Sequence, residues 1–312
     1  MPCEPEMTLH IQTPLIHSRP LSLAAGTEVW LKLEALQPSG SFKLRGIGAA
    51  CEAHARQGKR RFISSSGGNA GIAVAYAGRC LSIPVTVVVP QTTTERAKAL
   101  IRQEGAEVIV HGAAWHEANA LAQSMLGAAD AFIHPFDDPL LWQGHASLVD
   151  EVAASGFRPD AVLLSVGGGG LFSGVVEGLQ RNGWNTVPVI TAETTGAASF
   201  ARALEAGRRI ELERIDSVAT SLGARQVCER AFALGRSHPV QAQVVSDRAA
   251  LEACERFLDE QRILVEPACG AALALAYAGN EALRVHGRVM VVVCGGVTAT
   301  LEQISAWKAA QP

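Results

Sequence analysis

Residues 161–174, AVLLSVGGGGLFSG, join the most apolar predicted strand of the chain to a predicted helix through four consecutive glycines. Four glycines let the backbone come close to a bulky anion, while their N–H groups point at it from the start of a helix. The alternative is a tight connection without a ligand, although such a turn rarely needs four glycines at an entropic cost of about 0.5–1 kcal/mol each. The segment therefore predicts a phosphate site at the carboxyl end of a strand, where open α/β sheets bind ligands.

Strands and helices alternate on both sides of this segment. Strands are predicted over 61–64, 84–89, 107–111, 131–134, 188–193 and 288–294. Helices are predicted over 68–79, 115–126, 141–154, 171–180, 248–261, 271–285 and 300–309. One more helix, ending near Gln103, is predicted to begin at the capping-box pattern of Thr92 and Glu95. This order predicts an α/β fold with largely parallel sheets.

The length and the turns predict two domains. At roughly 150 residues per domain, 312 residues suffice for about two. The turn-rich stretch PFDDP, residues 135–139, is the best boundary between them. We expect a small domain over 47–144 and a large domain formed by 1–46 and 145–312.

Composition excludes several classes of protein. Lys and Arg total 27 and Asp and Glu total 30, for a net charge of −3, and the longest basic run is only Lys59-Arg60-Arg61, so no nucleic-acid partner is expected. The longest uncharged stretch, 161–176, is interrupted by the four glycines, so no membrane span is expected. Residues 1–6, MPCEPE, lack the features of a signal peptide, and the seven cysteines form no C-x-x-C pair. These features favour a cytoplasmic protein with reduced thiols.

Two further segments could carry chemistry. Residues 39–46, SGSFKLRG, place Lys43 at the start of a helix, where its amine could attack a carbonyl group; an isolated lysine in a turn is more often a solvated surface residue. Residues 64–71, SSSGGNAG, join a strand to a helix and offer N–H and hydroxyl donors for a carboxylate. An N-capped turn without a ligand is the equally plain interpretation of the second segment.

The motifs of other enzyme classes are incomplete. Phe172 or Ser173 stands where a G-x-G-x-x-G fingerprint needs its last glycine, although Glu193 lies at the distance of a ribose-binding acid. A nicotinamide enzyme is therefore the weaker alternative. The chain contains no P-loop, no G-x-S-x-G and no H-E-x-x-H pattern.

Four ordered segments together resemble the pyridoxal-phosphate enzymes of fold type II, and most closely the L-serine dehydratase (serine/threonine ammonia-lyase) family. They are SGSFKLRG at 39–46, SSGGNAG at 65–71, VGGGGLFSG at 166–174 and VCGG at 293–296. The stretches PFDDP at 135–139, GHAS at 144–147 and ILVEPACGAA at 263–272 agree with the same family. The resemblance covers nearly the whole chain and implies two open, twisted, mostly parallel sheets flanked by helices, in a large and a small domain.

The resemblance also implies roles for individual residues. It assigns Lys43 to the Schiff base with the cofactor aldehyde, Phe42 to a face of the cofactor ring, Asn69 to the ring O3′ and Cys294 to the pyridine nitrogen. A buried cysteine on a strand is otherwise most often a small core residue. The cofactor phosphate is assigned to Gly167, Gly168, Gly169, Gly170 and Leu171. The substrate carboxylate is assigned to Ser66, Gly67 and Asn69.

The family resemblance further implies a monovalent cation, K⁺, beside the phosphate loop, and a homodimer. The oxygens that would hold the cation belong to Gly167, Glu193, Ala197, Ser199, Leu222 and Ala224. The implied activity is the conversion of L-serine to pyruvate and ammonia and of L-threonine to 2-oxobutanoate. A serine racemase, a β-replacement enzyme and a non-catalytic amino-acid-binding scaffold remain alternatives. Gly67 stands where liver-type serine dehydratases usually carry alanine, and Val297-Thr298 replaces the Ser-Asn or Asn that often follows the glycine pair.

Overall fold

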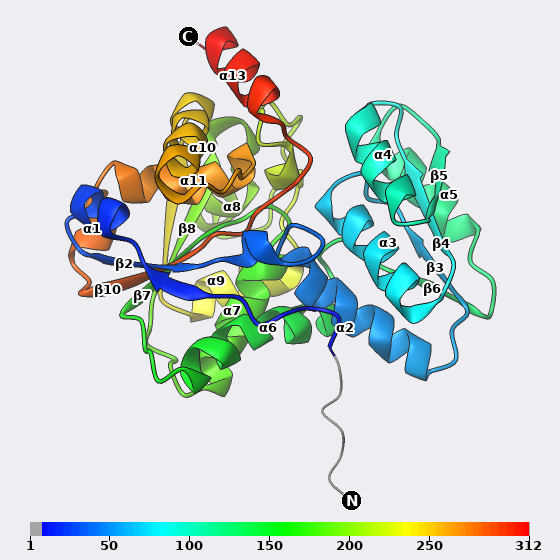
Figure 1. Cartoon of the computed structure of the whole chain (residues 1–312), viewed down its shortest axis with the longest axis horizontal. Helices are drawn as coiled ribbons and strands as arrows, with labels where there is room; N and C mark the ends of the chain where they lie inside the picture. The colour runs from blue at the N-terminus through cyan, green and yellow to red at the C-terminus, as the bar shows by residue number, and fades with distance from the viewer. Residues whose placement is uncertain (1–7, 312) are drawn as a thin grey trace, which may run out of the picture.

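The larger part of the molecule is built around a six-stranded sheet (Figure 1). The computed structural model describes residues 8–311. Residues 1–6, which lack the features of a signal peptide, lie outside this range. The strand order is β1-β2-β10-β7-β8-β9, and only the edge strand β1 runs antiparallel to its neighbour. The strands are β1 (Leu15–His17), β2 (Glu28–Lys32), β7 (Ala161–Ser165), β8 (Val189–Thr194), β9 (Val240–Val245) and β10 (Arg288–Val292).

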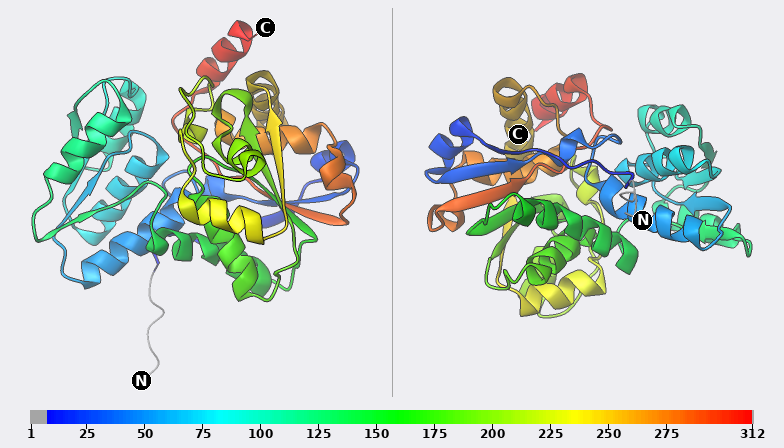
Figure 2. Two further views of the ribbon diagram at one scale, coloured as in Figure 1. Left: turned by 180° about the vertical axis from the view of Figure 1, so that it is seen from behind. Right: turned by 60° about the horizontal axis from the view of Figure 1, so that its bottom comes forward.

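A second sheet of four parallel strands lies beside the first (Figures 1 and 2). Its order is β5-β4-β3-β6, from β3 (Arg61–Ser64), β4 (Val85–Val89), β5 (Glu107–Val110) and β6 (Asp130–Phe132). All five residues of β4 and all five of β7 are buried, because helices cover both faces of each sheet. The sequences of these central strands are therefore continuous apolar runs rather than alternating ones.

Helices flank both sheets. Those nearer the N-terminus are α1 (Arg19–Ala25), α2 (Lys43–Arg56), α3 (Asn69–Leu81), α4 (Glu95–Gln103), α5 (Trp115–Ser124) and α6 (Pro139–Ala154). The others are α7 (Gly170–Arg181), α8 (Ser199–Ala206), α9 (Glu229–Ser237), α10 (Asp247–Gln261), α11 (Pro267–Tyr277), α12 (Glu281–Arg284) and α13 (Leu301–Ala310). Short 3₁₀ turns are η1 (Glu34–Leu36), η2 (Thr195–Ala197) and η3 (Thr220–Leu222). Within residues 8–311 we find no helix both long and apolar enough to span a membrane.

Two helices, α2 and α6, run between the sheets along the lower edge of Figure 1. They cross where Gly46 meets Gly144: a Cβ on Gly144 would lie only 2.7 Å from the Cα of Gly46. The close crossing fixes α2, and with it the side chains of its first turn, against the part of the chain that enters the six-stranded sheet. The sequence boundaries proposed above, 46/47 and 144/145, fall within these two helices.

The predicted alternation is confirmed between residues 61 and 194, where the ends of each element differ by one or two residues at most. Two details are wrong. Thr94, not Thr92, caps α4, because residues 90–93 form a turn closed by the Thr93 N–H and the Pro90 carbonyl at 3.0 Å. The helix predicted over 271–285 is two helices, because Gly279 takes a φ of +59° and Asn280 caps a new helix.

Candidate active site

Lys43 is the first residue of α2, and the residues just before it pair with the segment that follows β10. Ser41 pairs with Gly295 in an isolated antiparallel bridge, and the Phe42 N–H donates to the Cys294 carbonyl at 3.1 Å. The two segments come from the carboxyl ends of β2 and β10, which are parallel neighbours, so both reach the same edge of the sheet. Two of the predicted site segments are therefore joined directly.

The amine of Lys43 lies between a main-chain carbonyl and an aromatic ring. Its Nζ donates to the Pro135 carbonyl at 2.5 Å and lies 5.2 Å from the centre of the Phe42 ring. Burial lowers the pKa of Lys43 to about 8, although the nearby Cys294 and Glu266 oppose this change. A lysine with such a pKa is partly neutral near pH 8, and the neutral amine is the form that attacks carbonyl groups and accepts protons.

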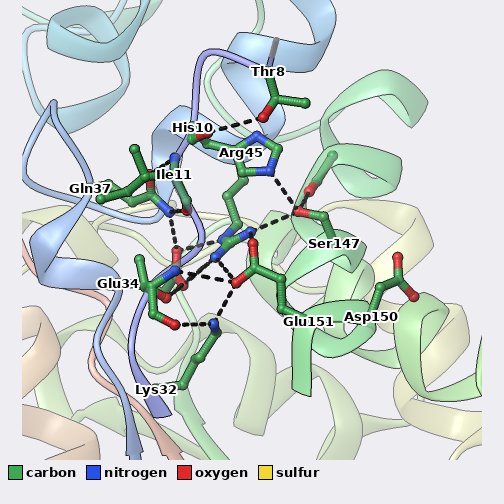
Figure 3. Close-up of polar contacts among 12 residues, drawn as sticks. Thr8, His10, Ile11, Lys32, Glu34, Gln37, Arg45, Ser147, Asp150 and Glu151 are labelled. Carbon is green, nitrogen blue, oxygen red and sulfur yellow. Dashed lines mark hydrogen bonds and ion pairs between the residues drawn. The ribbon is translucent and has the colours of Figure 1, made fainter. Parts of the chain in front are cut away.

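Two residues after Lys43, the fully buried Arg45 anchors the first turn of α2 (Figure 3). Its guanidinium donates to both oxygens of Glu34 at 2.7 and 2.8 Å and to both oxygens of Glu151 at 2.7 and 2.8 Å. Lys32 completes the cluster with a 2.5 Å contact to Glu151. Two cations thus face two carboxylates, and β2, η1, α2 and α6 are joined beneath the site.

The four glycines follow β7 and lead into α7, as the sequence predicts. Gly169 has a φ of +95°, which favours glycine. A Cβ on Gly168 would lie 2.4 Å from the ring of Phe136, and one on Gly170 would lie 2.7 Å from the Phe136 carbonyl oxygen. Close packing therefore accounts for part of the glycine requirement, so the number of glycines alone does not prove an anion site.

The N–H groups of this loop supply the independent observation. Within the described residues, no backbone or side-chain acceptor bonds the amides of Gly168, Gly169, Gly170 and Leu171. Four amides at a helix start with no internal partner form a concave donor set of the kind that binds phosphate groups. The Pro135-Phe136 pair lies against both this loop and the Lys43 amine, so the two predicted features are neighbours of one dipeptide.

Asn69, the first residue of α3, reaches across to the other sheet. Its Nδ2 donates to Glu266 Oε1 at 2.7 Å, and its Oδ1 accepts from the Val297 N–H at 3.2 Å. Glu266 is 4% exposed and also accepts from Thr298 Oγ1 at 2.8 Å. Burial raises the pKa of Glu266, while hydrogen bonds from Ser221, Thr298 and Asn69 oppose the rise. A buried carboxylate therefore lies between Asn69 and the segment after β10.

Comparison with known proteins places this geometry in a family. The sequence profile described as "Pyridoxal-phosphate dependent enzyme" matches residues 7–295, which include Lys43, the glycine loop and Cys294. The chain belongs to the pyridoxal-phosphate-dependent enzyme family. Its two mostly parallel sheets flanked by helices are the fold type II architecture of that family.

Individual members of the family are similar over nearly their whole length. The human "L-serine dehydratase/L-threonine deaminase" is 47% identical, covering 96% of this chain and 95% of that protein. The "L-serine dehydratase" of Dictyostelium discoideum is 41% identical, covering 95% of this chain and 91% of its own length. Among solved structures, an L-serine ammonia-lyase from the fungus Rhizomucor miehei superposes with a TM-score of 0.92 at 35% identity, covering 97% of this chain and 99% of that one.

The residues present fit the cofactor of the pyridoxal-phosphate-dependent family. An aldehyde needs a neutral amine, which Lys43 offers, and a phosphate needs clustered N–H donors, which the glycine loop offers. Cys294 is 7% exposed, and the hydrogen-bonded thiol of Cys269 and burial raise its pKa far above the usual value. Cys294 is therefore a neutral thiol, which suits a contact with a ring nitrogen that carries no proton.

The substrate loop predicted for the family lies between β3 and α3. Ser66 Oγ accepts from the Gly68 N–H at 3.4 Å, and the preceding Ser65 is held by Asn119 at 2.8 Å. Gly67 lies against Thr93: a Cβ on Gly67 would be 2.5 Å from Thr93 Oγ1. No described hydrogen bond joins Ser66 or Gly67 to Lys43, so their assignment to the substrate carboxylate stays a prediction.

The six residues predicted to hold a cation lie in two places, near Glu193 and near Gly167. Glu193 is fully buried at the end of β8, and its two oxygens accept from the Phe200 and Ala201 N–H groups at 2.8 and 2.7 Å, in the turn of Ser199. Gly167 lies against η3, where its Cβ would be 3.0 Å from the Cα of Leu222. Ala197 ends η2 and Ala224 follows η3. No described hydrogen bond or ion pair links Glu193 or Ser199 to Gly167 or Leu222.

Glu266 and the Pro135 carbonyl are site groups that the sequence reasoning did not assign. Glu266 and Asn69 are 197 positions apart in the sequence, so no motif spacing could have predicted their contact. The available signal was its place before Pro267, which marks a helix start, inside a stretch that resembles the family. The Pro135 contact uses a main-chain oxygen, which no residue type reveals.

Proposed function

We propose that this protein is a pyridoxal-phosphate-dependent ammonia-lyase that converts L-serine to pyruvate and ammonia, and L-threonine to 2-oxobutanoate. The observation that carries the proposal is the desolvated amine of Lys43, joined through Pro135-Phe136 to a loop of four unpartnered amides. The names of the similar proteins from human, Dictyostelium and Rhizomucor supply the substrate class.

The chain's own residues perform the proton transfer. When bound, pyridoxal phosphate serves as an electron sink that acidifies the Cα–H of the amino acid attached to it. Lys43 Nζ then accepts the Cα proton, since its lowered pKa keeps a neutral fraction near pH 8. The Pro135 carbonyl orients the amine, and the Phe42 ring, which packs 5.0 Å from the ring of His145, lies beside it. Burial of the amine strengthens its polar contacts.

A product assay with the purified holoenzyme tests the proposal. Serine should yield pyruvate and threonine should yield 2-oxobutanoate, with equimolar ammonia and a change in the visible absorption spectrum on mixing. Formation of D-serine without ketoacid would favour the racemase, and ketoacid-free consumption of a thiol co-substrate would favour the β-replacement enzyme. A spectral change without any product would favour the binding scaffold.

Gly67 is expected to influence the choice between serine and threonine. Its φ is not left-handed, so alanine fits the backbone, but the new methyl group would push Thr93 aside and take up space in the substrate loop. We expect Gly67→Ala to lower the threonine-to-serine ratio of kcat/KM, by at most the roughly 10- to 200-fold that one methyl group of substrate, about 1–3 kcal/mol, is worth.

Gly68→Ala is the matched control for Gly67→Ala, since a Cβ on Gly68 would have no neighbour closer than Ser66 Oγ at 4.0 Å. The two variants and the wild type are compared by steady-state kinetics with both amino acids. A rise in relative threonine activity in Gly67→Ala would refute the argument from space.

We also propose that K⁺ binds beside the phosphate loop. Glu193 is a fully buried carboxylate, and among the described residues no lysine or arginine forms an ion pair with it. The Ser199 hydroxyl nearby is buried without a described hydrogen-bond partner. Burial raises the pKa of Glu193 to about 7, and a cation held by carboxylate, hydroxyl and carbonyl oxygens would compensate the charge.

Activity should therefore depend on the monovalent cation. Replacing K⁺ with Na⁺ or tetramethylammonium should lower activity, and more K⁺ should be needed below about pH 7, where protons compete for Glu193. The measurement is a K⁺ titration of activity at pH 6.5 and 8.0. Equal activity in all three salts would remove this proposal.

Three further features belong to the proposal. We propose a homodimer, as the family resemblance suggests, and its molar mass in solution tests this. We propose a cytoplasmic location, in keeping with the free thiols of the six described cysteines. We also propose the division into a large domain, 1–46 with 145–312, and a small domain, 47–144, in keeping with the strands that build each sheet.

A further inference from the structure

Val297 is one of the residues that join the parts of the molecule built on the two sheets. It belongs to the Cys294 loop, which we define as residues 293–299, after β10 of the six-stranded sheet. Its N–H donates to Asn69 Oδ1 at 3.2 Å, and its carbonyl accepts from Arg96 Nε at 3.1 Å. Asn69 begins α3 and Arg96 lies in the first turn of α4, and both helices flank the four-stranded sheet.

The side chain of Val297 adds a packing contact on the same side. It packs against the apolar cluster of the four-stranded sheet, and it lies directly over Gly40, where a Cβ would come within 2.1 Å of Val297 Cγ1. Gly295 and Gly296, with φ of +89° and +117°, make the sharp turn that presents Val297 in this way. One residue therefore contacts α3, α4 and the segment before Lys43.

Arg96 is the exposed member of this set. It lines a groove of about 530 Å³ between α4 and the start of α13, with Ala99, Leu100 and Gln103 on one wall and Thr300, Glu302 and Gln303 on the other. The bond from Arg96 to Val297 joins α4 to the loop that leads to Thr300. Within the described residues, the Arg96 side chain forms no ion pair, and its hydrogen bond goes to the main-chain carbonyl of Val297.

We propose that Arg96 is a positioning residue that closes α4 onto the Cys294 loop and thereby holds Val297, Asn69 and Cys294 in place. Because the contact joins α4 of the four-stranded sheet to the loop after β10 of the six-stranded sheet, its loss loosens the Cys294 loop without unfolding either sheet. The same loop carries Cys294, whose carbonyl bonds the residue before Lys43, so a looser loop disturbs both sides of the site. Only the kinetic prediction for Arg96 rests on the proposed function; its structural role does not.

Hydrogen exchange of the protein, without and with cofactor, tests the positioning role. In Arg96→Ala, amides of residues 293–299 should exchange about two- to tenfold faster than in the wild type, the range that one hydrogen bond of ordinary strength allows. Arg96→Lys keeps the charge and should restore part of the protection. Arg102→Ala is the matched control, because Arg102 is an exposed arginine of the same helix whose side chain forms no hydrogen bond or ion pair among the described residues.

Kinetics give the second readout. If amino-acid binding requires the closed arrangement, Arg96→Ala should raise KM for serine by about two- to tenfold with little change in kcat, and Arg102→Ala should do neither. Equal exchange at 293–299 in Arg96→Ala and Arg102→Ala would overturn the proposal. Faster exchange in a protein that makes no ketoacid would support the positioning role and reject only the proposed function, so the two failures are distinguishable.

Discussion

Lys43→Ala should abolish turnover and the visible absorption band of the bound cofactor. The chain has five lysines, and the other four are engaged elsewhere: Lys32 with Glu151, Lys59 with the Ala128 carbonyl, Lys98 with Glu95 and Lys308 with Glu255. Lys43 is also the base at Cα in the proposed reaction, so its removal costs both covalent attachment and proton transfer. Loss of a positioned base alone lowers rates by roughly 10²- to 10⁴-fold.

The measurement is the absorption spectrum together with the ketoacid assay, and Lys59→Ala is the control because this lysine lies at the surface. Borohydride reduction of the holoenzyme followed by peptide mapping should label Lys43. A label on any other lysine would contradict the assignment. Cofactor uptake by the apoprotein should also become faster as pH rises towards 8, because burial lowers the pKa of Lys43 to about 8 and only the neutral amine attacks the aldehyde.

Local sequence was sufficient for the central strands and the helices between them. β4 and β7 are buried on both faces, so their apolar runs have a single interpretation once glycines and capping residues mark their ends. β9, VQAQVV, is a half-exposed edge strand with glutamines, and the sequence analysis did not predict it. β1 and β2 were missed too, because β1 has only three residues at the edge of the sheet and β2, EVWLK, has a charged residue at each end.

The site shows the same division between local and distant information. The glycine loop and the Ser66-Gly67 loop follow predicted strands, so the rule that ligands bind at carboxyl ends of parallel strands places them. Lys43 required the family resemblance, since its surroundings come from Pro135, Cys294 and Glu266, all more than 90 positions away in the sequence. Hydrogen bonds between such distant residues depend on the packed fold, which residue spacing does not encode.

Arg45→Ala should destabilise the protein strongly even though Arg45 touches no substrate. Arg45 and Glu34 are both fully buried, so the substitution leaves a carboxylate without its bidentate partner and Glu151 with Lys32 alone (Figure 3). Breaking a buried ion pair by removing one partner costs about 3–5 kcal/mol. At about 2–4 °C per kcal/mol for a chain of this size, Tm should fall by roughly 6–20 °C.

The exposed Arg181 is the matched control, since it also bonds two carboxylates, Asp150 and Glu177, but is 45% exposed, so Arg181→Ala should cost no more than about 1 kcal/mol. The pH dependence separates charge from packing. Arg45 lowers the pKa of Glu151, so its stabilisation is present above the usual carboxyl pKa and is lost as pH falls through the lowered one. The difference in Tm between wild type and Arg45→Ala should therefore shrink as the pH falls below the usual carboxyl pKa of 4.5. A difference independent of pH would assign the loss to packing of the arginine side chain, and equal losses in the two variants would show that burial does not amplify this ion pair.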